Sequence, residues 1–327
     1  MLLRTLSRLA TTSLAVTAVL LAPASAATDE PVVGPVLVKE AKSKDLCESQ
    51  PNRIFVSHFT GTECVAFHVS PGKPTVDTTV IYFNGDIPAA YFAKARVQDD
   101  IVKDIASSAR FIAEKTGVRI IFVARPGTLG SSGDHSRRGE HREMLIMNAA
   151  VDAIKARLGL KQIVVAGQSR GSQVAAVLLS MGRTDISCAV LGSGSLFTVE
   201  NERRFLLSKG ERVTEQRLHS LRLKYYDPSD YVSSLPKDAA RRIFILGDRA
   251  DTITPWDQQE AYGMRLRQHG HHAAIIEIKA RGREMHGATH MVLPAAAMCA
   301  KGTADQQIEW VVAAPGKGQP SARTVAM

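Results

Sequence analysis

Short apolar runs alternate with longer stretches of helical periodicity from about residue 78 onward. Six runs are rich in β-branched residues and nearly free of polar side chains: Thr78–Phe83, Arg119–Ala124, Gln162–Ala166, Ser187–Leu191, Arg242–Leu246 and Ala273–Ile278. Such runs are typical of parallel strands that helices cover on both faces. Helical patterns fill the intervals over Ala89–Lys115, Glu140–Leu158, Gly171–Met181 and Pro255–His269, and one over Leu293–Val312 follows the last run. The alternation predicts an α/β fold with a mostly parallel sheet flanked by helices.

Two earlier runs extend the predicted sheet to eight strands. Arg53–Phe59 and Glu63–Val69 are separated by Thr60-Gly61-Thr62 and predict an antiparallel hairpin at the sheet edge. The alternation is interrupted only at about residues 197–237, a stretch rich in Arg, Lys and Glu. Its apolar positions (Phe205, Leu206, Leu218, Leu221, Leu223, Tyr225 and Tyr226) would allow packing. We interpret it as a helical cap insertion, with a solvated linker as the alternative.

The first 26 residues have the pattern of a secretory signal peptide. Arg4 and Arg8 precede the apolar run Leu14–Leu21, and the small residues Ala24-Ser25-Ala26 follow it. No comparable apolar run follows, so we expect no stable membrane insertion. The pattern predicts cleavage near Ala26 and a secreted or periplasmic protein.

Composition and charge narrow the class of protein further. Of the 327 residues, 45% are hydrophobic and 22% charged, which is the balance of a globular chain. We expect one folded domain over residues 27–314 and a disordered tail over 315–327. The net charge of +9 is scattered, without a block of five like charges, so we expect no nucleic-acid partner.

Export would place the four cysteines in an oxidising compartment, where an even count suggests disulfides. Three pairings of Cys47, Cys64, Cys188 and Cys299 are possible. One of them ties Cys47 to Cys64 near the N-terminal hairpin and Cys188 to Cys299 in the C-terminal helix. The sequence leaves this pattern open against the other pairings and against free buried thiols.

The third parallel run leads directly into Gly167-Gln168-Ser169-Arg170-Gly171 and then into a helix. A strand, a tight turn with a glycine on either side of the serine, and a helix make up a nucleophile elbow. The elbow holds the serine at the carboxyl end of the sheet. We therefore predict Ser169 as a nucleophile.

A serine nucleophile needs a base, and the base needs an acid to orient it. Asp248 and Asp251 follow the fifth parallel run, and His286 and His290 follow the sixth. The order Ser, Asp, His is that of the α/β-hydrolases.

With these motifs in order, the chain resembles the α/β-hydrolase superfamily over about residues 50–313, and within it the prolyl oligopeptidase-like esterases and peptidases. Gly247, Asp251 and Pro255 match the family's pattern around its acid, which favours Asp251 over Asp248. The pair His286-Gly287 resembles the family's histidine motif and favours His286 as the base, with His290 as the alternative. The resemblance implies an acyl-enzyme hydrolase acting on a small-molecule ester or a peptide.

The tetrahedral intermediate of acyl transfer also needs two backbone donors, the oxyanion hole. The resemblance implies the amide of Arg170 as one donor. The other would come from Asn84-Gly85-Asp86, where we favour the amide of Asp86 and keep that of Ile87 as the substitute. A carboxylate near an oxyanion is unfavourable unless it is turned away or paired, and Arg125 is the expected brace or partner.

The sequence lacks the motifs of phosphate-binding and dinucleotide-binding proteins. The segment GTLGSSG lacks the ending of a phosphate-binding loop, and NGDIP has one glycine where a dinucleotide site needs three. No Cys-x-x-Cys spacing is present, and we assign the spaced pair His286 and His290 to the catalytic base, so we expect no metal and no cofactor. The sequence thus predicts an exported serine hydrolase for an ester, thioester or amide bond. The alternative is a catalytically inactive scaffold that serves as an exported binding protein.

Overall fold

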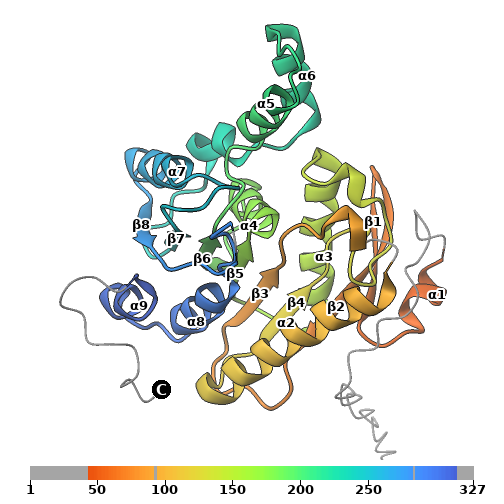
Figure 1. Cartoon of the computed structure of the whole chain (residues 1–327). Coiled ribbons are helices and arrows are strands. Elements are labelled where there is room, and N and C mark those ends of the chain that lie inside the picture. Colours follow the sequence, from red (N-terminus) through yellow and green to blue (C-terminus); the bar gives the residue numbers. More distant parts are fainter. Residues whose placement is uncertain (1–42, 92–93, 283, 315–327) are drawn as a thin grey trace, which may run out of the picture.

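The computed structural model describes residues 43–91, 94–282 and 284–314, which contain one eight-stranded sheet covered by helices on both faces (Figure 1). The predicted signal peptide (1–26) and tail (315–327) lie outside the described residues. The strands are β1 (Arg53–His58), β2 (Gly61–Val69), β3 (Thr79–Phe83), β4 (Ile120–Val123), β5 (Ile163–Gln168), β6 (Ile186–Gly192), β7 (Arg242–Gly247) and β8 (His272–Glu277). The hairpin and all six parallel strands predicted from the apolar runs are confirmed.

The order of the strands brings several chain segments to one edge of the sheet. The order is β1-β2-β4-β3-β5-β6-β7-β8, with β1, β2 and β4 joined by antiparallel pairing and the remaining pairs parallel. Phe83 of β3 pairs with Gly167 of β5, which pairs in turn with Leu191 of β6. The carboxyl ends of these strands therefore lie level, and the loops that follow them are neighbours.

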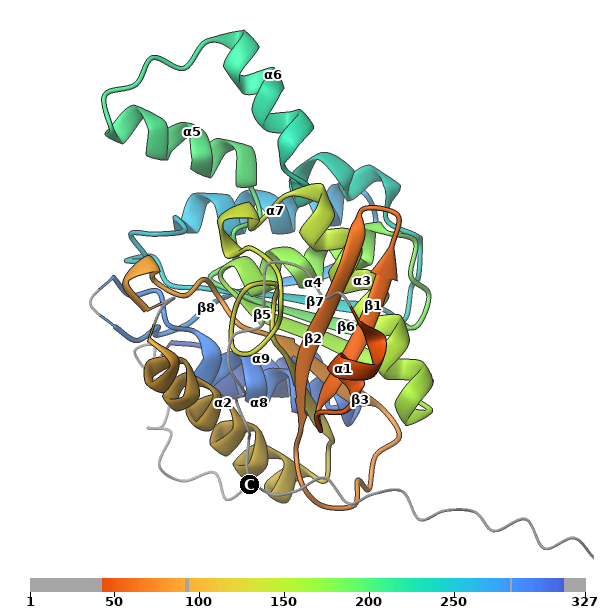
Figure 2. The same cartoon turned by 90° about the vertical axis from the view of Figure 1, so that its right-hand side faces the viewer.

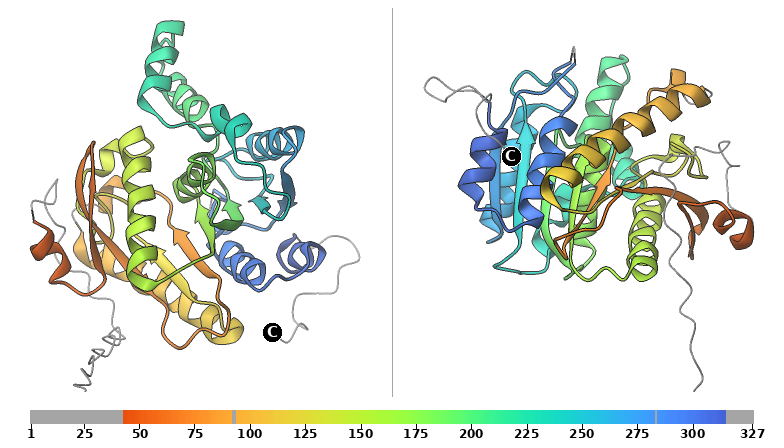
Figure 3. Two further views of the ribbon diagram at one scale, coloured as in Figure 1. Left: turned by 180° about the vertical axis from the view of Figure 1, so that it is seen from behind. Right: turned by 90° about the horizontal axis from the view of Figure 1, so that it is seen from below.

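Two layers of helices bury the two faces of the sheet (Figures 1 and 3). One layer holds α3 (His141–Leu158), α4 (Arg170–Ser180) and α7 (Trp256–Gln268), and the other holds α2 (Ala95–Thr116), α8 (Thr289–Ala300) and α9 (Asp305–Val312). Alternate residues of one strand, such as Val164 and Val165, belong to the cores on opposite faces, and both are fully buried. Burial on both sides explains why the central strands carry almost no polar residues.

The helix boundaries differ from the predicted ones in three places. The single helix predicted over Leu293–Val312 is wrong, because α8 ends at Ala300 and a turn with Gly302 in the left-handed region (φ +73°) separates it from α9. The predicted helix Ala89–Lys115 begins as a separate short 3₁₀ turn, Ala89–Tyr91, before α2. The short helix α1 (Lys44–Glu48) was not predicted. No helix within the described ranges has the length and apolar character to span a membrane.

The segment predicted as a cap contains α5 (Thr198–Ser208), α6 (Glu215–Lys224) and a 3₁₀ turn, Pro228–Ser234. Figure 2 shows α5 and α6 as a pair that stands above the rest of the fold. Leu221 is buried, whereas Phe205 is 57% and Leu223 is 70% exposed. Of the apolar positions that would allow the cap to pack, Leu221 is therefore used and Phe205 and Leu223 are not. A helix pair that stands away from the sheet has few neighbours to cover them.

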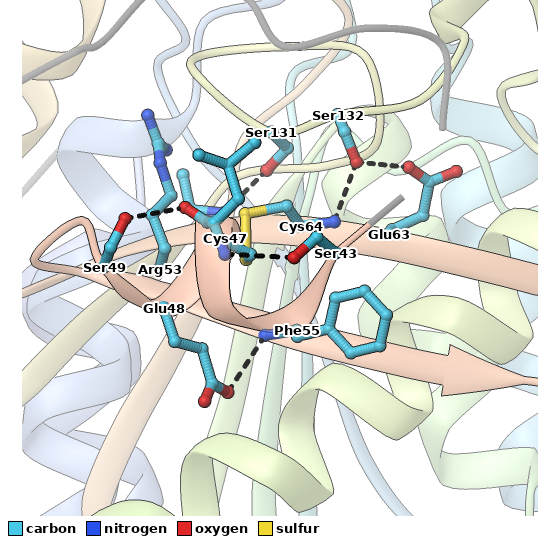
Figure 4. The surroundings of a disulfide bond; sticks show 12 residues. Ser43, Cys47, Glu48, Ser49, Arg53, Phe55, Glu63, Cys64, Ser131 and Ser132 are labelled. Atoms are coloured by element: carbon cyan, nitrogen blue, oxygen red, sulfur yellow. Dashed lines mark hydrogen bonds between the residues drawn. A yellow bond between two sulfur atoms is a disulfide. The ribbon is translucent and has the colours of Figure 1, made fainter. Parts of the chain in front are cut away.

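Two disulfides connect distant parts of this fold, Cys47–Cys64 and Cys188–Cys299. Their pairing agrees with the pattern considered from the sequence. Cys47 lies in α1 and Cys64 in β2, so this bridge attaches α1 to the hairpin (Figure 4). Cys188 lies in β6 and Cys299 in α8, so the second bridge holds α8 against the centre of the sheet.

The two bridges should differ in their contribution to stability. Cross-linking restricts the unfolded chain more when the closed loop is longer, and the sequence separations are 17 and 111 residues. Replacing Cys47 and Cys64 by Ala should cost about 3 kcal/mol, and replacing Cys188 and Cys299 about 4 to 5 kcal/mol. Urea unfolding measures both, with thiol titration of the denatured wild type as the control. Four reactive thiols before reduction would contradict the bridges.

Candidate active site

Ser169 lies in the turn between β5 and α4, in a backbone conformation that residues other than glycine rarely adopt. Its φ is +57° and its ψ is −123°. The two flanking glycines explain how the chain accommodates this turn. A Cβ atom on Gly167 would collide with the backbone of Gly171, and one on Gly171 would collide with the carbonyl oxygen of Phe83. The Gly-x-Ser-x-Gly pattern is thus required by the space around the turn.

The turn presents Ser169 at the carboxyl edge of the sheet, where its side chain is partly exposed. Helix α4 begins at the next residue, so the serine lies at the positive end of a helix dipole. Gly85, in the loop after β3, lies directly against it, since a Cβ atom on Gly85 would be 3.0 Å from the Cβ of Ser169. The loop predicted to supply an oxyanion donor is therefore next to Ser169.

Asp251 and His286, 35 residues apart in sequence, are hydrogen-bonded partners. His286 Nδ1 is 2.9 Å from Asp251 Oδ2 and 3.2 Å from Oδ1. The buried carboxylate also accepts hydrogen bonds from the amides of Ile253 (2.8 Å) and Thr254 (2.9 Å) and from the Thr254 hydroxyl (3.0 Å). Burial raises the pKa of Asp251, but the contact with His286 and the two amides outweigh it and lower the pKa overall. Asp251 is therefore ionised and fixed in orientation.

The loop that carries His286 is held beside the elbow. The side-chain amide of Gln168 donates a hydrogen bond of 3.0 Å to the carbonyl oxygen of His286. Arg281 and Gly287 exchange two backbone hydrogen bonds that close the loop. A glycine after the histidine would allow a sharp turn at Gly287, but the positive-φ residues of this loop are Gly282 (+87°) and Met285 (+50°). Gly287 instead allows a close approach, because a Cβ there would be 3.1 Å from the Arg281 oxygen.

The two alternative residues have other partners. Asp248 accepts hydrogen bonds from the amides of Ala250 and Ala280, both at 2.9 Å, and so ties the loop after β7 to the loop after β8. His290 lies in the first turn of α8, with Nε2 3.1 Å from the carbonyl oxygen of Lys279. The structure thus brings Asp251 and His286 together, and it places Asp248 and His290 in loop-bracing contacts.

Asp86 is surrounded by cationic side chains. Its carboxylate oxygens lie 2.9 Å from Arg125 Nη1, 2.9 Å from Arg138 Nε and 3.7 Å from Arg170 Nε. Burial raises the pKa of Asp86, but the neighbouring guanidinium groups, above all Arg125 and Arg170, lower it to about 2. The charge that would repel an oxyanion is therefore neutralised by its surroundings.

Arg125 is fully buried and fulfils both roles considered for it. Its Nε pairs with Glu143 Oε1 at 2.8 Å, and its Nη1 also lies 3.4 Å from the carbonyl oxygen of Asn84. It therefore links the loop after β3 to helix α3. A buried cation requires such partners, because an unpaired charge in the interior is strongly unfavourable.

Several residues of this region were not found from the sequence. The sequence pattern of the elbow leaves the identity of residue 168 open, so it assigned no role to Gln168. Thr254 lies three residues after Asp251, but no motif marked it. Arg138 contacts Asp86, and Glu202 contacts Arg170. Both contacts join residues that are far apart in sequence, so no local sequence pattern predicts them. Within the described ranges, no group of three or more His, Cys, Asp or Glu side chains could hold a metal ion.

Comparison with known proteins identifies the fold. No protein-family model matches the chain, and no curated protein sequence matches it. An esterase of Pyrococcus furiosus is similar in structure, with 17% identity and a TM-score of 0.50 over 77% of this chain and 91% of that one. Est1E from Butyrivibrio proteoclasticus is similar with 12% identity and a TM-score of 0.54 over 77% and 98%. The chain has the α/β-hydrolase fold, as the motifs suggested.

The charge cluster around Asp86 predicts a pH-dependent contribution to stability. A carboxyl with a depressed folded-state pKa stabilises the fold above its unfolded pKa, and this contribution is lost as the pH falls through the folded pKa. The pKa of Asp86 is lowered from 3.8 to about 2. Asp86→Asn should therefore lower the free energy of unfolding by about 1 kcal/mol at pH 7, a value that allows for solvent screening.

The difference between Asp86→Asn and wild type should disappear as the pH falls from about 4 to about 2. Urea unfolding at pH 7, 4 and 2.5 measures it, and Asp104→Asn, at an exposed position of α2, is the control. A destabilisation that is the same at all three pH values would show that the charge of Asp86 is not its cause.

Proposed function

We propose that this protein is an exported serine hydrolase that cleaves an ester, thioester or amide bond through an acyl-enzyme. The proposal rests chiefly on one observation. The strained Ser169 turn and the Asp251–His286 pair lie at the same edge of the sheet, and the contact between Gln168 and the His286 carbonyl joins them. Two solved structures with this fold are esterases, which is the same class of activity.

In the proposed reaction, Ser169 Oγ attacks the substrate carbonyl carbon while its proton passes to His286 Nε2. Asp251 accepts a hydrogen bond from the Nδ1–H group of His286, which selects the tautomer with Nε2 free to act as the base. It also stabilises the imidazolium that forms. The tetrahedral intermediate collapses, and the leaving alkoxide, thiolate or amine takes the proton from His286. Water then attacks the acyl-enzyme by the same route, releases the acid and regenerates Ser169.

The amides of Arg170 and Asp86 are the proposed oxyanion donors. The position of Arg170 at the first residue of α4 supports this role, because amides at a helix start have no partner within the helix and point toward negative charge. The contact between Gly85 and Ser169 supports the role of the loop after β3. Pairing of the Asp86 side chain with Arg125 and Arg138 allows its backbone to face an oxyanion without net repulsion.

Export is part of the proposal. Two disulfides within the described residues fit an oxidising compartment, where such bonds form and persist. A secreted or periplasmic enzyme of this fold would act on a small-molecule ester or on a peptide. The alternative, an inactive binding protein, is less well supported, because the paired Asp251–His286 geometry has no evident use in a scaffold without catalysis.

Ser169→Ala should abolish hydrolysis of a short-chain aryl ester, with a loss on the order of 10⁴-fold in kcat, because the acyl-enzyme cannot form without the hydroxyl. An organophosphonate probe should label the wild type at Ser169 and leave the variant unlabelled. Circular dichroism should show that both proteins are folded. A folded wild type that neither reacts with the probe nor hydrolyses any ester would favour the binding-protein alternative.

The two loop histidines should separate kinetically. His286→Ala removes the proposed base and should approach the loss seen for Ser169→Ala. His290→Ala removes backbone contacts such as that with the Lys279 carbonyl and should cost less than about tenfold. The measurement is kcat/KM for both variants on one ester. If His290→Ala were the inactive variant, the base would lie one turn later, in α8.

A further inference from the structure

The side chain of Arg170 connects three parts of the molecule. Arg170 directly follows the proposed nucleophile in the chain, and its side chain is only 9% exposed. Nη2 donates a 2.8 Å hydrogen bond to Glu202 Oε1 on cap helix α5, and Nη1 donates one of 3.1 Å to Gln173 Oε1 on α4. Nε is 3.7 Å from Asp86 Oδ2 in the loop after β3. One guanidinium thus lies between the cap and the proposed oxyanion loop.

The position of this guanidinium is tightly limited. Gly139, with a φ of +77°, passes so close that a Cβ atom there would be 2.7 Å from Arg170 Nη1. Glu202 is 21% exposed, so solvent screens its pairing with Arg170 less than that of a pair at the open surface. A small change in one of the charged partners would therefore be transmitted to the others.

Glu202 and Asp86 attract the same guanidinium. With both carboxylates charged, Arg170 is held at 2.8 Å from Glu202 and at 3.7 Å from Asp86. Without the charge of Glu202, the attraction that draws Nη2 away from Asp86 would be lost, and the guanidinium would shift toward the oxyanion loop with Nη1 still held by Gln173. The amides of Arg170 and Asp86 are the two proposed oxyanion donors, so such a shift would change their spacing.

We propose that Glu202 is a positioning residue, through which cap helix α5 sets the geometry of the oxyanion hole by way of Arg170. This inference rests on the proposed function for its catalytic consequence. The cap then contributes to the rate of acyl transfer. Oxyanion donors act mainly in the transition state, so the effect should appear in kcat more than in KM.

Helix α5 provides a matched control. Glu200 lies two residues before Glu202 and is also partly exposed, but its carboxylate pairs with Arg203 (2.7 Å) and Arg204 (3.2 Å) of the same helix. Neutralising Glu200 removes a similar charge from α5 without touching Arg170. Any effect on the stability or charge of the cap alone should therefore be shared by the two positions.

The first test is the steady-state hydrolysis of a short aryl ester. Glu202→Gln should lower kcat about tenfold with a change of less than about twofold in KM, because displacing a donor costs less than removing one. Glu200→Gln should retain wild-type kcat and KM, and Glu202→Asp, which keeps the charge, should recover part of the loss. Wild-type kcat in Glu202→Gln, or an equal loss in Glu200→Gln, would overturn the inference.

A second measurement does not depend on activity. Hydrogen exchange of peptides covering residues 84–88 and 168–173 should be at least about threefold faster in Glu202→Gln than in wild type or Glu200→Gln, because both segments lose their fixed positions. Equal exchange in the two variants would overturn the coupling even if no ester is hydrolysed. Ser169→Ala, assayed alongside, tests the proposed function separately: full activity in that variant refutes the proposed nucleophile, whatever the result for Glu202.

Discussion

The left-handed backbone of Ser169 is the constraint on which the rest of the site depends. A residue with a side chain in such a conformation costs on the order of 1–3 kcal/mol, and it persists only where the surrounding structure enforces it. Here β5 and α4 enforce it from either side, and Gly171 lets α4 approach the end of β3 so closely that a Cβ atom there would be 2.0 Å from the Phe83 carbonyl oxygen. The same close approach brings the loop after β3 against the serine. The strained turn and the neighbouring loop are therefore consequences of one packing requirement.

A series of ion pairs connects the loops at the sheet edge to helix α3 and to the cap. Arg125 is buried between Glu143 of α3 and Asp86, and Asp86 also faces Arg170, which reaches Glu202 in the cap. The two buried cations of this cluster, Arg125 and Arg170, both have anionic partners, as the cost of an unpaired charge in the interior requires. The result is a chain of ion pairs from the core to α5. Parts of the protein that share no backbone contact are linked electrostatically through it.

The elements of the sheet were predictable from sequence because their signal is local. A strand buried on both faces must be apolar throughout, and each such run appeared as a strand within one or two residues. The sequence predicted the helices less well where tertiary packing or a single residue determined their ends or their exposure. The break between α8 and α9 lies at Lys301-Gly302-Thr303, a polar stretch with a glycine that the single predicted helix ran through. The exposure of Phe205 and Leu223 depends on a helix pair that has few neighbours.

By itself the sequence determined the Ser169 elbow, because a glycine on either side of a serine between strand and helix is a pattern within five residues. The order of residues narrowed the acid to Asp248 or Asp251 and the base to His286 or His290, and only the family resemblance favoured Asp251 and His286. The tertiary structure decided which pair meets, since Asp251 and His286 come from loops after different strands. The same holds for the pairing of the cysteines and the contact of Arg170 with Glu202. These contacts depend on the direction of side chains across long sequence separations, and no local pattern of residues carries that information.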